Sequence, residues 1–470
     1  MTAEEDGAGS PRAPGGTRAR EGALNSQILS TERLATTALL TDRYELTMLD
    51  AALQSGRAAS PAVFEVFTRR LPDRRPWGVF AGLGRLLQAL GDFRFGPDEI
   101  AWLQANHIVS PPALEWLSGY RFTGHIDAYR EGEFYTAGSP VLTVEGGFAE
   151  AVLLETLVLS VLNFDSAVAT AASLITSAAG GRPVIEMGSR RVDPAAAVAA
   201  ARAAYLAGFA STSNLEAGRR YGVPTAGTAS HAFVLAYPGE REAFSAQVSA
   251  FGPSTTLLVD TYDTAQGICN AVEAAGPQLG AVRIDSGDLG REAARARSLL
   301  DAHGASSTKL VVTGDLDAHS IAALGAAPVD MYGVGANVVT GMGVPTAGFV
   351  YKLVAVGEPG QAPGTPLRPV AKRSAGKRSF GGRKWAWRAL LDQPPALVEP
   401  GAPTAAGPAW ADVVATGPEP PLEGARPLQV RVMGGGEVIA WPSLEEARAW
   451  HADRKREIGS EDPLLLDRRS

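Results

Sequence analysis

The run Arg283-Ile284-Asp285-Ser286-Gly287-Asp288 places a cation and two carboxylates at the end of an apolar stretch. On an extended strand, residues two apart project to the same face, so Arg283 and Asp285 would lie side by side. An ion pair inside an apolar strand is costly to keep, which favours a pair that also meets a ligand. The alternative is a purely structural pair that lines the interior of a barrel.

Two glycine-rich runs follow further along the chain. The first is "VVTGDLD", with Gly314 and Asp315, and the second is "YGVGANVVTG", with Gly333, Gly335 and Asn337. Glycines leave backbone amides uncovered, and such loops after the last strands of a barrel bind phosphate groups. Neither run is a Walker A sequence and the second only approaches GxGxxG, so ordinary glycine turns are the alternative.

Arginines and a histidine complete the candidate chemistry. Arg190 and Arg191 follow a glycine in "EMGSRR", and planar guanidinium groups suit carboxylate or phosphate ligands. Arg190 is nearer the strand, and Arg191 fits a surface salt bridge equally well. His231 stands behind small residues in "PTAGTASHAF", where it could act as a base or a nucleophile, although a lone histidine is more often structural. Together these groups suit transfer chemistry on a phosphorylated sugar, with acidic groups holding Mg²⁺ and ribose hydroxyls.

The elements that must position these groups alternate between apolar strands and helices beyond residue 181. This alternation predicts parallel βαβ units in an α/β fold, arranged as an irregular (β/α) barrel with functional groups at the carboxyl ends of its strands. A doubly wound open sheet is the rival fold. The strand candidates are "PVIEMGSR", "VPTAGTASHAF", "TTLLVDTYD", "GAVRIDSGD", "KLVVTGDLD" and "VDMYGVGANVV". Their polar ends carry Arg190, His231, Asp263, Asp285, Asp288, Asp315 and Asn337. None ends in a lysine, which argues against a Schiff-base aldolase.

Composition changes divide the chain into four parts. We expect a disordered tail at 1–36, an amino-terminal α+β sandwich domain at 37–150, and the barrel with the active site at 151–356. The remainder, 357–470, holds a basic loop and then a hairpin and a charged helix that pack back on the first domain and complete it. The basic residues of the loop are Lys372, Arg373, Lys377, Arg378, Arg383 and Lys384. They could bind the phosphates of ATP or pyrophosphate, or form a solvated loop.

Overall composition limits the possible partners. The 470 residues carry a net charge of -7, which gives no general attraction to nucleic acid or to an anionic membrane. Cys269 is the single cysteine of the sequence, so an internal disulfide and a multi-cysteine metal site are excluded. No uncharged apolar run reaches the length of about 18 residues expected of a spanning helix, and the first residues lack a secretion signal. We expect a cytoplasmic protein.

Eight ordered runs over about residues 39–356 resemble nicotinate phosphoribosyltransferases. They are "LLTDRYELTML", "EMGSRR", "ASTSNLEAG", "GTASHAF", "VRIDSGDL", "VVTGDLD", "YGVGANVVT" and "GFVYKLVAV". The resemblance implies a type II phosphoribosyltransferase fold, with a sandwich domain and an irregular barrel. It also implies an enzyme that joins nicotinate to phosphoribosyl pyrophosphate with the help of ATP and Mg²⁺, giving nicotinate mononucleotide for NAD synthesis, and acting as a homodimer.

The resemblance also implies roles for particular residues. His231 would be phosphorylated transiently by ATP, and Asp285 would support the Mg²⁺-bound ribose and the oxocarbenium-like transition state. Tyr44 would stack on the pyridine ring across a dimer interface, and Thr340 would contact the 5-phosphate. Further substrate contacts are expected from Arg190, Asn214, Thr228, Arg283, Gly314, Asp315, Gly333 and Gly335; the metal ligands are not specified.

Three alternatives stay open within this resemblance. Nicotinamide or quinolinate could replace nicotinate as the substrate, or the chain could bind ligands without turnover. Met187 stands where related enzymes that use nicotinamide carry an aromatic ring, so stacking from that side could be lost. An arginine-rich pocket favours a carboxylate, and quinolinate would require positive charge for two of them.

Overall fold

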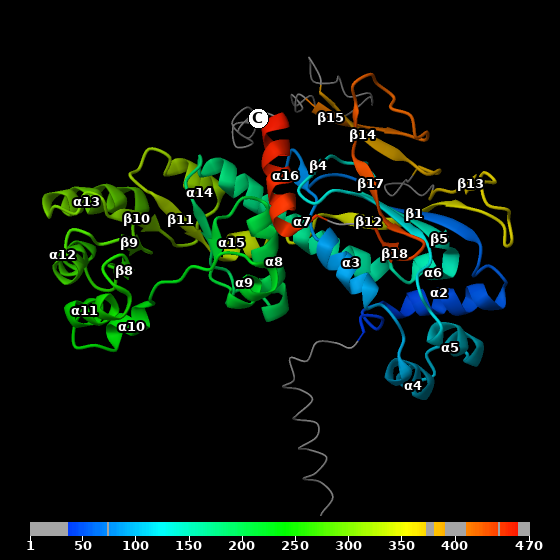
Figure 1. The fold of residues 1–470 in the computed structure, drawn as a ribbon, viewed down its shortest axis with the longest axis horizontal. Helices are drawn as coiled ribbons and strands as arrows, with labels where there is room; N and C mark the ends of the chain where they lie inside the picture. The colour runs from blue at the N-terminus through cyan, green and yellow to red at the C-terminus, as the bar shows by residue number, and fades with distance from the viewer. Residues whose placement is uncertain (1–35, 73–74, 373–379, 391–409, 440–441, 459–470) are drawn as a thin grey trace, which may run out of the picture.

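The computed structural model describes residues 36–72, 75–372, 380–390, 410–439 and 442–458. The predicted tail therefore lies outside the described residues except for Thr36, and so do Arg373, Lys377 and Arg378 of the basic run. Figure 1 shows two halves side by side, a parallel sheet with its helices and a group of antiparallel strands, with helices α7 and α16 between them.

The antiparallel half is built on a seven-stranded sheet in the order β13-β12-β1-β5-β3-β17-β18. Its strands are β1 (Pro61–Thr68), β3 (His125–Tyr129), β5 (Leu142–Gly147), β12 (Phe349–Val356), β13 (Arg368–Pro369), β17 (Gln429–Gly434) and β18 (Glu437–Val438). Strand β12 pairs with β1, and β17 pairs with β3, although both come from late in the chain. A barrel domain that ran to residue 356 would include β12, which instead belongs to this sheet.

Shorter strands and five helices surround this sheet. Strands β2 (Gly78–Val79) and β4 (Phe134–Tyr135) pair with each other, and β14 (Trp385–Leu390) lies between β15 (Trp410–Ala415) and β16 (Arg426–Pro427). The helices are α2 (Arg43–Gln54), α3 (Leu83–Gly91), α4 (Pro97–Ala105), α5 (Pro111–Ser118) and α6 (Phe148–Val152). The predicted terminal hairpin is formed by β17 and β18, and the charged helix after it is α16 (Leu444–Glu457).

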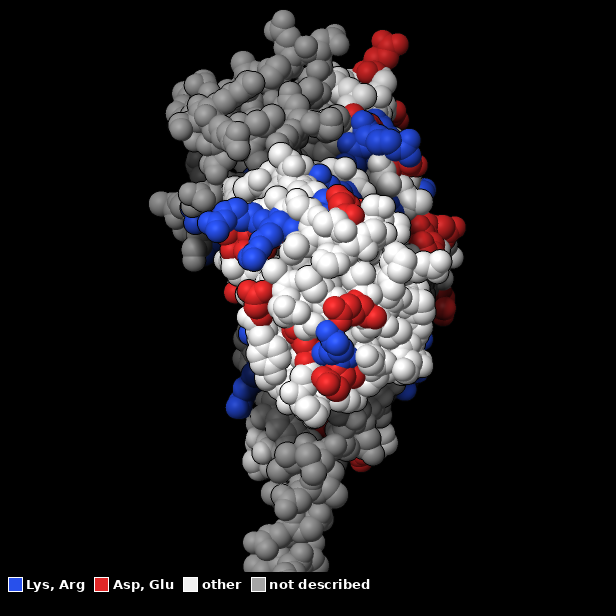
Figure 2. Space-filling model, turned by 90° about the vertical axis from the view of Figure 1, so that its left-hand side faces the viewer, with Lys and Arg blue, Asp and Glu red and all other residues white. Residues whose placement is uncertain are grey.

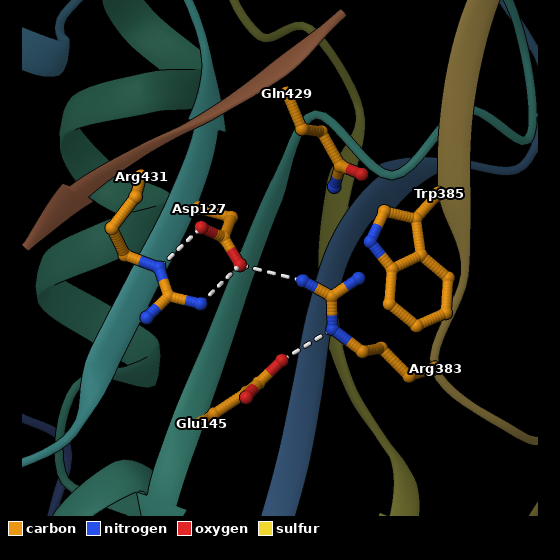
Figure 3. Close-up of a pocket in the computed structure, with 6 residues that line it drawn as sticks. All are labelled: Asp127, Glu145, Arg383, Trp385, Gln429 and Arg431. Carbon is orange, nitrogen blue, oxygen red and sulfur yellow. Dashed lines mark hydrogen bonds and ion pairs between the residues drawn. The ribbon is translucent and has the colours of Figure 1, made fainter. Parts of the chain in front are cut away.

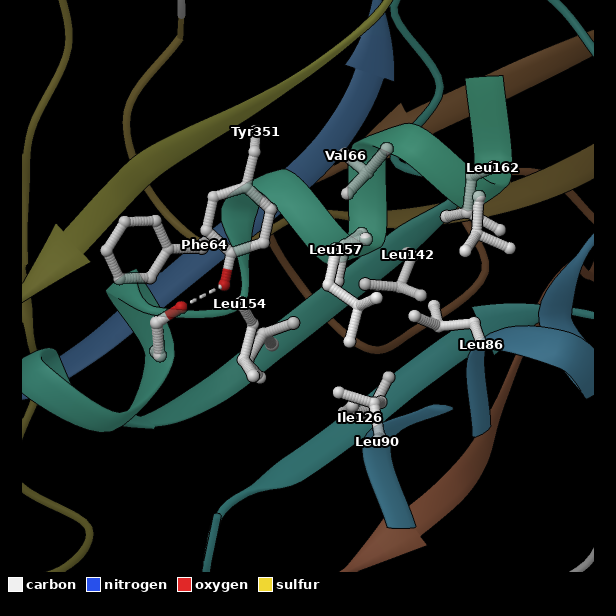
Figure 4. Close-up of a cluster of buried hydrophobic side chains, with 14 of the residues drawn as sticks. Phe64, Val66, Leu86, Leu90, Ile126, Leu142, Leu154, Leu157, Leu162 and Tyr351 are labelled. Carbon is white, nitrogen blue, oxygen red and sulfur yellow. Dashed lines mark hydrogen bonds between the residues drawn. The ribbon is translucent and has the colours of Figure 1, made fainter. Parts of the chain in front are cut away.

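A buried apolar cluster lies between this sheet and the helices that cover it (Figure 4). Phe64 and Tyr351 come from the paired strands β1 and β12 and stack with their ring centroids 4.8 Å apart. The Tyr351 hydroxyl would be costly to bury alone, and it donates to the carbonyl oxygen of Ala151 at 2.8 Å. The packing of residues from early and late segments in one core fixes β12 in the sheet.

The second half contains a six-stranded parallel sheet in the order β7-β6-β11-β10-β9-β8. Its strands are β6 (Val184–Glu186), β7 (Ser211–Thr212), β8 (Thr256–Leu258), β9 (Ala281–Ile284), β10 (Lys309–Val312) and β11 (Met331–Val334). The first strand, β6, pairs with the last, β11, and the other neighbours are consecutive in the chain. This order is that of a barrel left open between β7 and β8, so the predicted irregular barrel is confirmed and the doubly wound alternative is wrong.

Helices follow the strands of the barrel. They are α8 (Pro194–Leu206), α9 (Leu215–Tyr221), α10 (His231–Leu235), α11 (Glu240–Phe251), α12 (Thr264–Ala275), α13 (Leu289–Ala302), α14 (Ala318–Ala323) and α15 (Ala336–Val339). Helix α8 shows why they form: Asp193 accepts hydrogen bonds from the amides of Ala195 and Ala196, Pro194 opens the first turn, and alanines follow.

One strand prediction is wrong. In "VPTAGTASHAF" only Thr225 makes a β contact, an isolated bridge to Thr212, and His231 begins helix α10. The sixth strand is β7, in the segment "ASTSN", which was not predicted as a strand. His231 is therefore presented by a helix start and not by a strand end.

Helix α7 (Glu155–Ala178) joins the two halves. The helical stretch 148–178 is long and apolar enough to cross a membrane, but 67% of its apolar window is buried inside the protein, as in a core helix. Beside it, Arg202 of α8 makes a bidentate pair with Glu131 of the turn after β3, at 2.8 and 2.7 Å. Both side chains are buried, at 5% and 2% exposure. This pair ties the barrel to the antiparallel half.

Candidate active site

A cavity of about 190 Å³ opens at the carboxyl ends of β6, β9, β10 and β11. It is lined by Met187, Arg190, Arg191, Arg283, Asp285, Thr313, Gly314, Asp315, Gly333, Gly335 and Ala336. Seven of the twelve residues to which the resemblance assigns a role are among them: Arg190, Arg283, Asp285, Gly314, Asp315, Gly333 and Gly335.

Arg283 and Asp285 lie on one face of the end of β9, as the spacing predicted. The guanidinium Nη2 is 3.4 Å from Asp285 Oδ2, and the side chains are 14% and 26% exposed. Burial alone would raise the pKa of Asp285, but a hydrogen bond from Thr313 and the charges of Arg283 and His231 hold it below the usual value. The carboxylate is therefore ionised at neutral pH.

His231 approaches the same carboxylate from the start of α10. Its Nε2 is 3.9 Å from Asp285 Oδ2, and its Nδ1 lies 3.1 Å from the hydroxyl of Thr261. The side chain is 39% exposed, so the small residues before it do leave the imidazole accessible. Thr228 of the same segment accepts a hydrogen bond from Arg283 Nη1 at 3.3 Å.

Asp260 also belongs to this group, although the sequence reasoning missed it. One carboxylate oxygen, Oδ2, accepts from the amide of Asp285 at 2.8 Å and from the hydroxyl of Ser286 at 2.7 Å. The other oxygen, Oδ1, is buried and has no hydrogen-bond partner among the described residues. Asp263, the predicted polar end of the same strand, instead caps α12 by accepting from the amide of Gln266.

Glycine is required in the two loops because neighbouring atoms lie too close for a side chain. A Cβ on Gly333 would lie 2.5 Å from Thr313 Cγ2, and one on Gly314 would lie 2.6 Å from the Asp285 carbonyl oxygen. Gly314 has φ +111° and Asp315 has φ +46°, so this loop adopts left-handed backbone. The result is two bare stretches of backbone on one side of the cavity.

Arg190 and Arg191 line the cavity from the loop after β6, the strand that pairs with β11. Both are exposed, and neither has an ion-pair partner among the residues that the structure describes. Asn214 holds the neighbouring turn, because its side chain caps α9 and donates to Ser189 Oγ at 3.0 Å. With Arg283, three arginines face two aspartates around the cavity, which favours an anionic ligand.

Several candidates lie apart from the cavity. Thr340 ends α15, with its hydroxyl donating to the Ala336 carbonyl at 2.8 Å. Asp288 caps α13, and the Asn337 amide donates to the Asp315 carbonyl at 2.9 Å. Tyr44 is 46% exposed on α2, which Figure 1 places at the end of the molecule away from β8, β9 and β10.

Burial, followed by the charges of Glu155 and Glu45, raises the pKa of Tyr44 to about 12. The ring therefore keeps its phenolic proton at neutral pH. As an uncharged, half-exposed aromatic surface on α2, it could stack on a flat ligand only if that ligand were brought to this end of the molecule.

A second cavity of about 380 Å³ contains part of the predicted basic run (Figure 3). There Arg383 pairs with Asp127 at 2.5 Å and with Glu145, and its guanidinium lies 3.8 Å from the centre of the Trp385 ring. Arg431 pairs with the same Asp127 at 2.5 Å. These charges neutralise one another and fasten the late strands to the sheet.

The outer face of the barrel half shows no comparable gathering of charge. In Figure 2 acidic and basic side chains lie in small mixed groups on a mostly uncharged surface. On this face, positive charge does not form a continuous patch.

The chain is similar to proteins of one named family over most of its length. A family model described as the nicotinate phosphoribosyltransferase (NAPRTase) N-terminal domain matches residues 39–163. Nicotinate phosphoribosyltransferase pncB1 of Mycobacterium tuberculosis is 51% identical over 455 residues, 95% of this chain and 95% of that protein. The nicotinate phosphoribosyltransferase of Bacillus subtilis is 37% identical over 69% of this chain and 68% of its own length.

A solved structure shares the fold. The crystal structure of human nicotinic acid phosphoribosyltransferase superposes with a TM-score of 0.71 at 27% identity, covering 90% of this chain and 95% of that one. The arrangement of barrel and antiparallel sheet is thus one already seen in a solved protein.

Proposed function

The chain belongs to the nicotinate phosphoribosyltransferase family, and from this premise we propose that it joins nicotinate to phosphoribosyl pyrophosphate, giving nicotinate mononucleotide and pyrophosphate for NAD synthesis. The observation that carries the proposal within the structure is the cavity itself. It combines an ionised carboxylate, three arginines and two bare glycine loops at the carboxyl ends of the barrel strands.

In this reaction the ring nitrogen of nicotinate forms a bond to the anomeric carbon of the ribose. The bond from that carbon to the pyrophosphate oxygen breaks, and the pyrophosphate leaves with the electron pair. Positive charge develops on the sugar as the bond breaks, and a fixed negative group beside it lowers the barrier. The carboxylate of Asp285 is that negative group, because Thr313 and Arg283 keep it ionised.

The anionic parts of the substrates have complementary partners. Arg190 and Arg191 would hold the ring carboxylate or a phosphate, because they line the cavity without ion-pair partners among the described residues. The backbone around Gly314, Gly333 and Gly335 would hold the 5-phosphate, with Thr340 behind it. A single carboxylate on the ring suits this charge better than the uncharged amide of nicotinamide.

We assign His231 as the residue that ATP phosphorylates. A nitrogen of its imidazole would form a bond to the γ-phosphorus as the bond to ADP breaks, and water would later release the phosphoryl group as phosphate. The exposed imidazole gives the nucleotide access, and its Nδ1 is held toward Thr261 while its Nε2 faces Asp285. This contact would couple the phosphorylated state to the carboxylate that serves the sugar.

Mg²⁺ fits this site when it is bound to the substrate phosphates. Among the described residues there is no group of three or more His, Cys, Asp or Glu that could hold a metal ion alone. Mg²⁺ commonly reaches such sites with most of its ligands from phosphates and water, and it would neutralise the leaving pyrophosphate.

We also propose a homodimer in the cytoplasm. Tyr44 does not line the cavity of its own chain, and its helix α2 lies away from β8, β9 and β10 in Figure 1, so we assign its stacking on the pyridine ring to the site of a second copy. The single Cys269 suits a reducing compartment.

The test is product formation with nicotinate, nicotinamide and quinolinate in parallel, each with and without ATP. We expect nicotinate mononucleotide and pyrophosphate from nicotinate, faster with ATP. His231→Ala should lose both the ATP stimulation and the acid-labile phosphate label from radioactive ATP, whereas His319→Ala, a change at an exposed histidine of α14, should keep both. Binding of nicotinate without any product would overturn the proposed activity, and a label that survives in His231→Ala would overturn the phosphohistidine.

A further inference from the structure

We propose that Thr313 is a positioning residue, whose hydroxyl orients Arg283 and Asp285 together for the phosphoribosyl transfer. This inference rests on the proposed function and names how its central ion pair is held. Thr313 is the first residue after β10, and its backbone amide donates to the carbonyl of Ile284 on β9 at 2.9 Å. Its side chain is therefore placed opposite the end of the neighbouring strand.

The hydroxyl of Thr313 joins both members of the pair. It donates to Asp285 Oδ1 at 2.6 Å and accepts from Arg283 Nε at 2.9 Å. One hydroxyl has one donor and two acceptor positions, so both hydrogen bonds can exist at once. The direct contact between Arg283 Nη2 and Asp285 Oδ2 is longer, at 3.4 Å, so the shared hydroxyl makes the shorter link.

The surroundings of Thr313 hold its hydroxyl in this direction. The residue is 3% exposed, and its methyl group lies toward Gly333, where even a single added carbon would come within 2.5 Å. A β-branched side chain has few favourable rotamers. With the methyl group fitted against Gly333, the hydroxyl points to β9.

As a result, the two oxygens of Asp285 have different contacts. Oδ1 is taken by Thr313, and Oδ2 is left facing Arg283 Nη2 and His231 Nε2. Oδ2 is thus the oxygen presented to the reacting sugar and to the histidine. Without the hydroxyl, the carboxylate could rotate and Arg283 would lose the acceptor for its Nε.

The test compares Thr313→Val, which removes the hydroxyl at nearly constant shape, with Thr313→Ser, which keeps it. Losing a hydrogen bond to charged groups should lower kcat by roughly tenfold to a hundredfold in Thr313→Val. The KM for nicotinate should change by less than kcat. Thr313→Ser should recover most of the rate, and Thr313→Ala serves as the second hydroxyl-free variant if Thr313→Val does not fold.

A second measurement needs no turnover. The Asp285 carboxyl carbon is titrated by NMR in protein with labelled aspartate, assigned by Asp285→Asn. The charged and titratable groups around this carboxyl are Arg283, His231, Asp260, Asp315, Arg190 and Arg191. None of them changes in Thr313→Val, so the titration of Asp285 should move to higher pH by loss of one stabilising hydrogen bond, and return in Thr313→Ser.

Unchanged kcat and an unchanged Asp285 titration in folded Thr313→Val would overturn the positioning role. Equal impairment of Thr313→Ser and Thr313→Val would also overturn it, because shape and not the hydroxyl would then matter. Absence of turnover in the unsubstituted protein would refute the proposed function alone, and the NMR titration would still decide the role of Thr313.

Discussion

Gly333 is the position where the structure gives the sharpest prediction for a single substitution. A Cβ added by Gly333→Ala would lie 2.5 Å from Thr313 Cγ2 and 2.8 Å from Met187 Sδ. The methionine side chain can move aside, because it is long and unbranched. Thr313 can only turn away by breaking its hydrogen bonds to Arg283 and Asp285.

The size of the effect follows from this clash. An extra methyl group in a packed region costs about 1–3 kcal/mol. If that cost falls on the catalytic arrangement, kcat/KM decreases by about 5-fold to about 150-fold. The assay is nicotinate mononucleotide formation at saturating ATP, with thermal unfolding followed in parallel to confirm that the variant is folded. Gly91→Ala is the matched control, because no atom outside its own helix backbone and chain neighbours lies within 4 Å of the added carbon and the position is outside the site.

A double substitution separates this explanation from a general disturbance of the loop. Gly333→Ala with Thr313→Ser removes the clashing methyl group and keeps the hydroxyl, so it should recover a large part of the activity. An unaltered rate in Gly333→Ala, or no recovery in the double variant, would refute the assigned packing.

Two further predictions concern the assembly of the molecule. Glu131→Gln leaves buried Arg202 without its charge partner and should lower the free energy of unfolding by about 3–5 kcal/mol at pH 7, measured by denaturant titration. Glu216→Gln, which removes the charge of an exposed ion pair, should change it far less. Burial raises the pKa of Glu131, but the charge and hydrogen bonds of Arg202 lower it by more, so the pKa in the folded protein is depressed. The ionised carboxylate therefore stabilises the fold above the ordinary glutamate pKa. The difference in stability between Glu131→Gln and the unsubstituted protein should shrink as the pH falls from the ordinary glutamate pKa through the lower folded pKa. In the proposed dimer, Tyr44→Ala and His231→Ala subunits should each lack ATP-stimulated turnover, and mixing them should restore it through one intact site per mixed dimer. A mixture without ATP stimulation would count against Tyr44 acting in the partner's site.

The strand ends could be predicted from sequence where a strand was long enough to show an apolar run. Arg283 and Asp285 follow such a run, and their alternation in sequence gives the same face in the structure. Strand β7, with only Ser211 and Thr212, shows no such signal, because its pairing depends on the neighbouring β6. The segment before His231 looked like a strand because small and β-branched residues fit an extended chain, but it lacks a paired neighbour beyond Thr225.

The choice between capping and site aspartates could not be made from strand position alone. Asp263, Asp288 and Asp317 each stand at the start of a helix and accept from its amides, whereas Asp260 reaches across to β9. A cap signature was visible in the sequence, because each of these three precedes a helical segment. The role of Asp260 depends on which strand lies beside β8, and one sequence does not contain that information.

The contribution of Thr313 was hidden for the same reason. The sequence indicates its neighbours Gly314 and Asp315 instead, because a glycine leaves backbone amides uncovered and a carboxylate can bind a ligand. The role of a threonine after an apolar strand can be recognised only when β9 is known to lie alongside β10.

The strand order of the antiparallel sheet also sets when it can be completed during synthesis. The barrel strands from β6 to β11 are contiguous in the chain, so their sheet can pair once residue 334 has emerged. Strand β3 gains its outer neighbour only when β17 appears at residue 429, and β1 must await β12. Before β12 and β17 appear, β1 and β3 are unpaired sheet edges of the nascent chain, and such edges are templates for association with other chains. Truncation before residue 429 would leave one such edge permanently open, and aggregation would be its expected result.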